Sequence, residues 1–352
     1  MSWEDYSAEQ NKKNPFENHA RGFRQGKEYQ IIMEKTEIPV IDVIIPAYRP
    51  DDSFHKLIRL LLEQSVKPHH IYVLQTIEDG EQVLQPLDQR MSVHPVPKKE
   101  FDHGATRDYG AGLAVKDIGD DISQHYILFM TQDAVPAGTE LLERLVKPFG
   151  DDRTAITYAR QLAREEADLL ERLTRVHNYP PEDQVKSKED LERLGIKTYF
   201  CSDVCAMYRL DRYMEQGGFV HPTIFNEDMI MASRMIQAGY QVVYCGSAEV
   251  YHSHNYSCMQ QFHRNFDLGV SQKQYREVFE SISSEKEGAG YAKSTLLYLL
   301  KRGKPGKAFY FALQCGFKLI GYKLGKNYDH LPRKMVLWCT MTPGYVLFHQ
   351  DE

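Results

Sequence analysis

The chain has 352 residues, of which 42% are hydrophobic and 26% charged, a composition typical of a soluble globular protein. This length allows a full hydrophobic core, in one large domain with additions or in two domains. No apolar run approaches the roughly 20 residues that cross a membrane. The polar N-terminus is unlike a secretory signal. We therefore expect a cytoplasmic protein whose six cysteines are free thiols.

Charge is distributed unevenly behind the net value of −6. Between Lys293 and Lys334 the sequence has ten Lys and Arg residues and a single acid, Asp329, so the rest of the chain is strongly acidic. A basic segment on an acidic body favours a polyanionic partner, either nucleic acid or an anionic membrane surface. No recognisable nucleic-acid-binding module surrounds the segment, so we expect no nucleic-acid role.

The first predicted elements form a strand, a helix and a second strand. Residues 1–37 are polar without a clear period and are expected to form an arm or a short helical segment before the domain. Residues 38–47 are rich in Val and Ile, which predicts a buried strand. Residues 51–64 repeat apolar side chains at helical spacing, and residues 71–74 predict another buried strand. This order predicts a βαβ unit, and therefore a parallel sheet.

Residues 101–112, FDHGATRDYGAG, combine three glycines with Arg107 and lead into a helix of small residues. Backbone N–H groups and a guanidinium in such a segment can approach phosphates. The glycines can equally serve close packing of a helix on the sheet. The order is not GxGxxG and follows the second strand rather than the first, which disfavours NAD binding.

The segment 126–136, YILFMTQDAVP, predicts a strand buried on both faces that ends before Asp133. Pro136 prevents the strand from continuing. A carboxylate at the carboxyl end of such a strand lies on the edge where α/β sheets bind ligands. An ordinary turn Asp that bonds its own backbone is the alternative for Asp133.

The middle of the chain alternates helical and strand-like segments. Helices are expected at 141–149, at 165–178 and from Asn226, and strands at 155–159, 198–209, 240–245 and 248–251. The charged stretch 182–193 is expected to be a solvated flap. From about Met259 the pattern is helical, with aromatic residues and lysines in 291–300 and 308–324. Those helices are consistent with packing on the body, with packing on a second subunit or with lying on a membrane surface.

Two further groups are candidates for chemistry. Glu227 and Asp228 begin a helix, where the macrodipole favours carboxylates, although such pairs commonly serve only as caps. His252 and His254 are two residues apart, so on a strand they share a face; a buried, hydrogen-bonded histidine is the usual explanation for such a residue. Cys201 and Cys205 lack a second pair with zinc-finger spacing, which disfavours a zinc site.

The ordered set VIIPAY, HGATRDYGA, YILFMTQDAVP, GGF, NED, AGYQVVY and VYHSH resembles the family 2 inverting glycosyltransferases. The resemblance implies an α/β GT-A fold, with a mostly parallel sheet flanked by helices and a helical C-terminal extension. It covers about residues 38–257 and implies an arm at 1–37, a catalytic domain at 38–258 and a basic helical region at 259–352. The motifs are most similar to those of the bacterial rhamnosyltransferase branch, which builds cell-surface polysaccharides.

The resemblance also implies roles for individual residues. Asp228 would be the catalytic base, and Asp133 and His252 would bind the metal, with Thr131 standing where the family has a further Asp. The expected donor-binding residues are Pro46, Ala47, Tyr48, Thr76, Glu78, His103, Gly104, Arg107, Gln132 and Asp133. The expected acceptor-binding residues are Asp203, Asn226, Glu227, Asn255 and Tyr256.

The chemistry of this family accounts for those residue types. A dication, Mn²⁺ or Mg²⁺, offsets charge developing on the diphosphate leaving group, and an imidazole ligand favours Mn²⁺. One base without a nucleophile implies inversion. The expected donor is dTDP-rhamnose, and the expected acceptor is a glycan, lipid-linked or free. The alternatives are a UDP-hexose donor, a catalytically silent scaffold, favoured by Thr131, and a nucleotidyltransferase, for which residues 46–49 offer no phosphate-activating signature.

Overall fold

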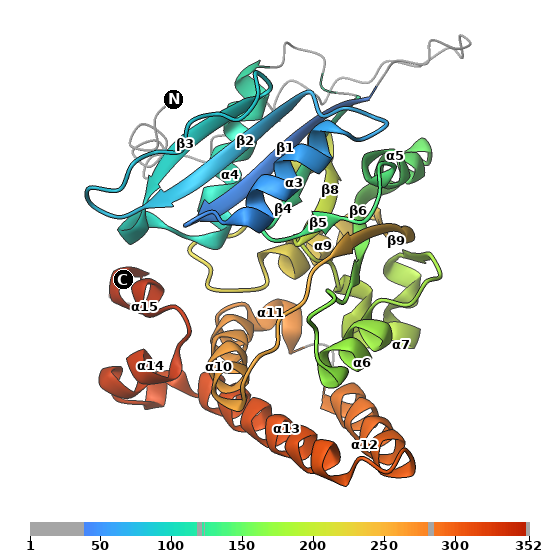
Figure 1. The fold of residues 1–352 in the computed structure, drawn as a ribbon, viewed down its shortest axis with the longest axis vertical. Helices are drawn as coiled ribbons and strands as arrows, with labels where there is room; N and C mark the ends of the chain where they lie inside the picture. The colour runs from blue at the N-terminus through green and yellow to red at the C-terminus, as the bar shows by residue number, and fades with distance from the viewer. Residues whose placement is uncertain (1–38, 118–121, 123, 281–284, 350–352) are drawn as a thin grey trace.

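The computed structural model describes residues 39–117, 122, 124–280 and 285–349, so the expected arm at 1–37 lies outside the described residues. Its centre is one mixed sheet in the order β3-β2-β1-β4-β8-β6-β9-β5, with β7 paired to β9 (Figure 1). The described strands are β1 (Val40–Tyr48), β2 (His70–Ile77), β3 (Met91–Pro97), β4 (His125–Met130), β5 (Val135–Pro136), β6 (Thr154–Leu162), β7 (Gln184–Lys186), β8 (Cys205–Arg209) and β9 (Gln241–Tyr251).

Most strands of the sheet run in one direction, as expected. β1 pairs in parallel with β2 and β4, and β2 with β3. β8 is antiparallel to both β4 and β6, so β6 runs in the direction of β4, and β9 is parallel to β6. The carboxyl ends of β1, β2, β3, β4, β6 and β9 therefore meet at one edge, which is where an α/β sheet presents a ligand site.

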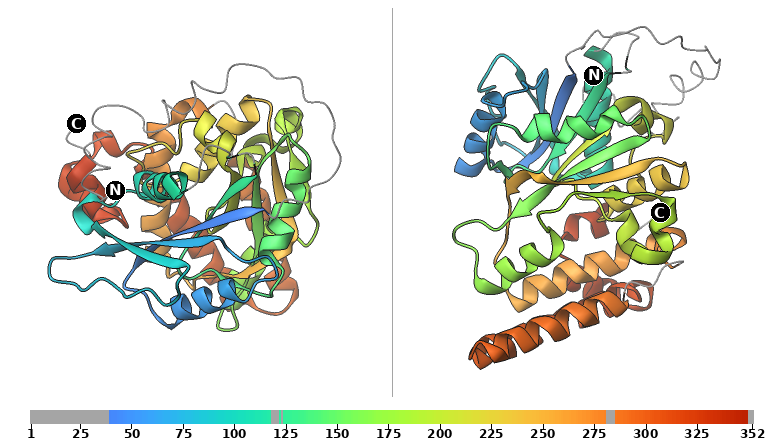
Figure 2. Two further views of the ribbon diagram at one scale, coloured as in Figure 1. Left: turned by 90° about the horizontal axis from the view of Figure 1, so that it is seen from above. Right: turned by 90° about the vertical axis from the view of Figure 1, so that its right-hand side faces the viewer.

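Helices cover both faces of this sheet (Figures 1 and 2). The α-helices are α3 (Asp52–Leu62), α4 (His103–Asp117), α5 (Leu141–Val146), α6 (Leu169–Asn178), α7 (Leu191–Leu194), α8 (Leu210–Glu215), α9 (Glu227–Gln237), α10 (Cys258–Gln274), α11 (Arg276–Phe279), α12 (Glu285–Lys301), α13 (Pro305–Gly325), α14 (Arg333–Cys339) and α15 (Pro343–His349). The apolar side chains of α3 and α5 pack on one face, and those of α4, α8 and α9 on the other.

Four segments differ from the sequence-based expectation. The stretch expected as a solvated flap contains β7, which pairs with β9, and the two strands expected near 240–251 are one continuous strand. Residues 198–209 form a strand only from Cys205. The edge strand β3 was not expected, because Pro95 and Pro97 obscure its pattern; an edge strand tolerates proline.

The C-terminal helices pack on the body and on one another. α10 and α13 cross at three glycines, Gly269, Gly321 and Gly325, where an added Cβ would lie 2.0–2.4 Å from a backbone oxygen of the facing helix. Apolar side chains of α10 pack with those of α14 and α15, and those of α12 and α13 pack with Leu170 of α6. No helix in the described part of the chain is long and apolar enough to cross a membrane.

Candidate active site

Four of the predicted site residues end or follow strands at the common carboxyl edge. Tyr48 ends β1, Glu78 follows β2, Asp133 follows β4 and His252 follows β9. Asp203 lies just before β8, whose antiparallel direction brings its start to the same edge. The topology of the sheet therefore gathers residues that lie far apart in the sequence.

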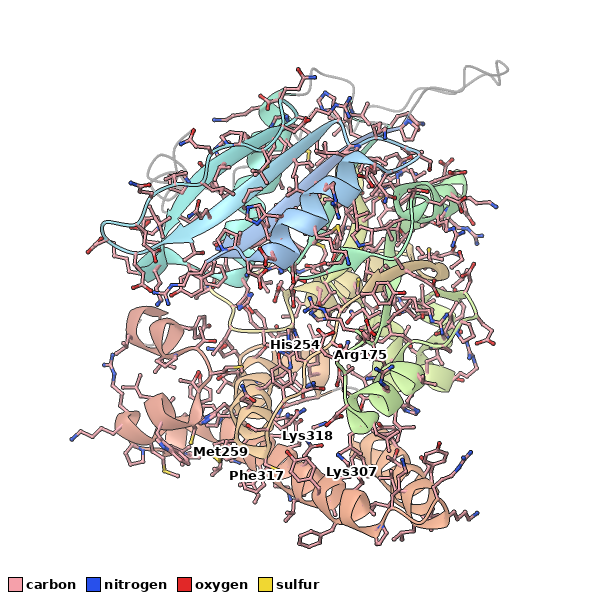
Figure 3. All side chains as sticks on the ribbon, in the orientation of Figure 1. Arg175, His254, Met259, Lys307, Phe317 and Lys318 are labelled. Carbon is pink, nitrogen blue, oxygen red and sulfur yellow. The ribbon has the colours of Figure 1, made fainter. Side chains whose placement is uncertain are left out.

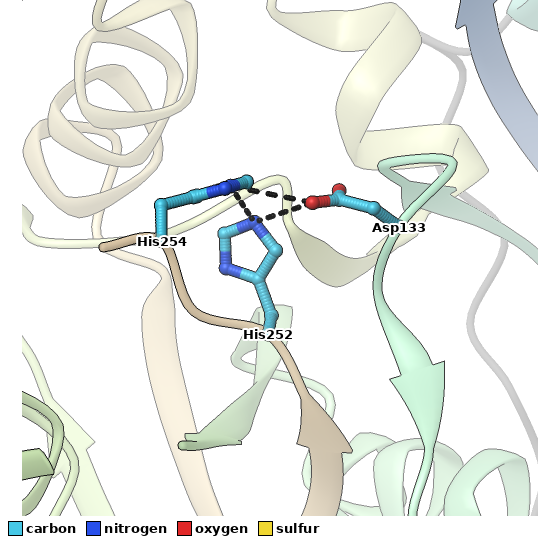
Figure 4. A group of neighbouring side chains, drawn as sticks. All are labelled: Asp133, His252 and His254. Carbon is cyan, nitrogen blue, oxygen red and sulfur yellow. Dashed lines mark hydrogen bonds and ion pairs between the residues drawn. The ribbon is translucent and has the colours of Figure 1, made fainter. Parts of the chain in front are cut away.

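Asp133, His252 and His254 form a compact group of metal-ligating side chains (Figure 4). The Nε2 atoms of His252 and His254 lie 3.5 and 3.2 Å from Asp133 Oδ2, and 3.1 Å from each other. Such spacings suit neighbouring ligands of one divalent ion bound at roughly 2.1 Å. The sequence pointed to Asp133 and His252 as ligands, and the structure adds His254.

Side chains behind this group fix its chemistry. The Gln161 side-chain oxygen lies 3.0 Å from His252 Nδ1 and also accepts a hydrogen bond from Arg175, which can only donate. His252 Nδ1 must therefore carry the proton, which leaves a lone pair on Nε2 for a metal. Burial lowers the pKa of His252 to about 3, and burial also lowers the pKa of His254, so both imidazoles are neutral near pH 7.

Arg164 approaches the metal-ligating group from the end of β6. Its Nη2 lies 3.6 Å from Asp133 Oδ2 and donates to the Asp133 backbone carbonyl, and its backbone N–H donates to Ser253 Oγ. The guanidinium offsets part of the carboxylate charge and fixes the loop that carries it.

A second group consists of three carboxylates around the buried guanidinium of Arg107. Arg107 Nη1 lies 3.1 Å from Glu227 Oε1, and Arg107 Nε lies 3.7 Å from Asp203 Oδ2. Asp228 completes the group, since its Oδ2 accepts the Asp203 N–H at 3.2 Å and its Oδ1 accepts the Met229 N–H at 2.7 Å. One guanidinium cannot neutralise three carboxylates. Burial and the charge of Glu227 raise the pKa of Asp228 to about 7, so Asp228 is poised to accept a proton near neutral pH.

Hydrogen bonds and the peptide link between Ser202 and Asp203 join the two groups. The Gln161 amide accepts from His252 and donates to Ser202 Oγ at 2.9 Å, and the next residue, Asp203, donates its N–H to Asp228. These contacts therefore connect His252, which lies beside Asp133, to Asp228 at the sheet edge.

The far side of the same edge carries a polar group around Tyr48. Gln132 accepts the Tyr48 N–H at 2.8 Å and donates to the Tyr48 carbonyl at 3.0 Å, which ties the end of β1 to the loop of Asp133. Tyr48 Oη donates to Glu78 at 2.5 Å, and Lys98 Nζ lies 2.6 Å from the same carboxylate. Tyr48, Glu78 and Gln132 thus lie together in the structure, and Lys98 joins them without a sequence signal.

Several other predicted site residues take part in the packing of the fold. Pro46, Ala47 and Thr76 lie within β1 and β2, and the latter two are buried. An added Cβ on Gly104 would lie 2.2 Å from the Val220 carbonyl oxygen, so this glycine permits close packing of α4 on the loop before α9. His103 is half-buried at the start of α4, with its ring against Phe101.

The predicted acceptor residues also make internal bonds. Asn226 adopts φ 68° and donates to Ser271 of α10, so it sets the entry into α9. Asn255 accepts the Asp168 N–H and donates to the Glu166 carbonyl, and the Tyr256 ring stacks on that of His254. Of these residues, Tyr256 therefore lies directly beside the metal-ligating group.

Comparisons with known proteins identify the family of the chain. Residues 42–215 match the family model described as "Glycosyl transferase family 2". The O-antigen chain rhamnosyltransferase RfbN of Salmonella typhimurium is 36% identical over 87% of this chain and 95% of the relative. The O-antigen chain rhamnosyltransferase WbaN of Salmonella anatum is 33% identical over 88% of this chain and 96% of the relative.

A comparison with solved structures identifies the fold. Mannosyltransferase PcManGT from Pyrobaculum calidifontis, in complex with GDP-Man and Mn²⁺, superposes with a TM-score of 0.52 over 90% of this chain and 94% of that one, at 12% identity. The likeness confirms the expected GT-A architecture, in which helices flank a central sheet.

Proposed function

The chain belongs to glycosyl transferase family 2, and we propose that it transfers L-rhamnose from dTDP-rhamnose to a hydroxyl of a growing cell-surface glycan, with inversion. The identity to two O-antigen chain rhamnosyltransferases, over nearly their whole lengths, supports the sugar and the class of acceptor.

The position and environment of Asp228 support the proposed mechanism. Asp228 removes the proton from the acceptor hydroxyl as that oxygen attacks the anomeric carbon from the face opposite the diphosphate. Its carboxylate is fixed by two backbone N–H groups, and its pKa is raised toward neutrality by burial and by Glu227. Such a base contributes about 10²–10⁴ in rate.

The chemistry of the second group supports a divalent cation. One carboxylate and two neutral imidazoles with converging Nε2 atoms suit Mn²⁺. They suit Mg²⁺ less well, because Mg²⁺ prefers oxygen ligands. Bound by Asp133, His252 and His254, the ion would offset charge on the diphosphate leaving group. The structural relative from Pyrobaculum calidifontis is described with Mn²⁺.

A panel of donors tests the proposal. With MnCl₂ present, dTDP-rhamnose should raise the melting temperature of the full chain, because a ligand at 100 times its dissociation constant stabilises the native state by about 2.7 kcal/mol. UDP-glucose and GDP-mannose should give smaller shifts. Stabilisation only by a UDP-hexose would change the donor and leave the enzyme class intact, whereas the absence of any shift or transfer would indicate a silent scaffold.

A further inference from the structure

The inner side of α13 lies against the candidate site. Gln314 Nε2 donates to the Tyr256 carbonyl at 3.1 Å, two residues from His254. Lys318, one turn further along α13, interacts electrostatically with Glu171. Glu171 in turn pairs with Arg175 and accepts the His254 N–H. Figure 3 shows Arg175 and His254 on the side of Lys318 that faces the sheet.

The outer side of the same helix is apolar and uncovered by the described residues. Phe309, Leu313 and Ile320 recur at intervals of four and seven residues, so they share one face of α13. Phe309 is 68% exposed and Ile320 is 55% exposed. The opposite face carries Gly321 and Gly325, which pack on α10. The apolar stripe is therefore not part of the core.

The neighbouring helix α12 extends this surface. α12 and α13 form the end of the molecule farthest from β1–β3 (Figures 1 and 2). We define the α12–α13 face by its exposed apolar residues, Leu297, Tyr298, Leu300, Phe309, Leu313, Leu319 and Ile320, and by its exposed cations, Lys293, Lys301, Arg302, Lys304, Lys307 and Lys323. Neither helix has an acidic residue between 291 and 325.

We propose that the α12–α13 face docks on the surface of an anionic lipid bilayer, with α13 lying in the plane of the interface. Aromatic and aliphatic side chains bordered by lysines match an interface that is apolar inside and anionic outside. Pairing of this face with the same face of a second copy would oppose like charges. Because a helix is about 10–12 Å thick, docking places Tyr256 and His254 within about one helix diameter of the bilayer surface. An acceptor held at the membrane would then reach the candidate site from the bilayer side of α13.

Vesicle binding by the full chain tests this inference. In flotation assays the wild-type protein should bind vesicles of phosphatidylcholine with 30% phosphatidylglycerol, bind pure phosphatidylcholine weakly, and dissociate as salt rises, because salt screens exposed charges. Ile320→Glu should abolish binding. Leu87→Glu is the matched control, since Leu87 is a 46%-exposed apolar residue in the loop between β2 and β3. The pair K304Q/K307Q should weaken binding by about fivefold for each lysine.

Three results would overturn the inference. The first is absence of wild-type binding to the anionic vesicles. The second is equal loss of binding in Leu87→Glu and Ile320→Glu. The third is a wild-type dimer that Ile320→Glu dissociates, without any vesicle binding, which would make the face a contact between copies. Unchanged melting temperatures and unchanged donor stabilisation in the variants show that the fold and the proposed function are intact whichever result is obtained.

Discussion

His252 Nδ1 lies 3.0 Å from the side-chain oxygen of Gln161, and this hydrogen bond sets the direction of the lone pair that faces Asp133 and His254. Gln161 is 2% exposed and bonds Arg175 and Ser202 as well, so its amide cannot rotate freely. Bonds of this kind orient a metal-binding histidine and fix its tautomer.

Gln161→Leu should lower the affinity for Mn²⁺ by about 10–100-fold, the usual cost of losing the partner behind a metal ligand. Titration calorimetry of the full chain measures the change. Gln237→Leu is the control, because Gln237 is the last residue of α9 and its amide donates to Tyr199 Oη. Equal affinities in wild type and Gln161→Leu would show that Gln161 does not orient a ligand.

Replacing either histidine of the metal-ligating group by alanine should raise the Mn²⁺ concentration that gives half-maximal transfer. The effect should exceed that of Gln161→Leu, because a ligand is lost rather than its support. His263→Ala is the control, since His263 bonds the Cys339 carbonyl in the C-terminal region. If His254→Ala titrates like wild type, the site has two protein ligands and not three.

The pH dependence of kcat/KM should report the carboxylates around Arg107. A base acts in its ionised form, and burial together with Glu227 raises the pKa of Asp228 to about 7. Activity should therefore fall about tenfold for each pH unit below that value, with an apparent pKa that belongs to the coupled group. Glu227→Gln removes a neighbouring negative charge, so it should move this limb to lower pH. A limb that stays in place would exclude Asp228 as the titrating base.

The crossing of α10 and α13 makes a prediction about stability. An added Cβ at Gly325 would lie 2.0 Å from the Phe266 carbonyl oxygen, so Gly325→Ala must push the helices apart. Overpacking of this kind costs about 1–3 kcal/mol, measurable by urea unfolding. Gly316→Ala, on the same helix, meets no atom within 4 Å and should stabilise the protein by up to about 1 kcal/mol. Equal effects would contradict the close crossing.

Local sequence patterns predicted several of the strands whose carboxyl ends form the edge of the sheet. The strands before Tyr48 and Asp133 are buried on both faces, so their sequences are continuous apolar runs. Such runs can be recognised in a single sequence. The ordered motifs then identified Asp228 and His252 as candidates. The hydrogen bonds that connect these two residues could be identified only from the structure.

The rest depended on contacts between distant residues. Gln161 lies inside β6 and has no unusual neighbours in sequence; its role comes from β9, which brings His252 beside it. β7 is short and lies in a charged stretch of sequence, and its pairing partner is β9. His254 was visible as the second histidine of a His-x-His pair, but its position beside Asp133 follows from the loop after β9.

The central claim is that Asp228 is the base of a transfer reaction at a site connected to the metal-ligating group. The direct measurement is single-turnover transfer by Asp228→Asn, with donor binding followed by thermal shift in the same samples. We predict that donor and Mn²⁺ stabilise this variant as they stabilise wild type, while transfer falls by about 10²–10⁴. Transfer at the wild-type rate by Asp228→Asn would contradict the account.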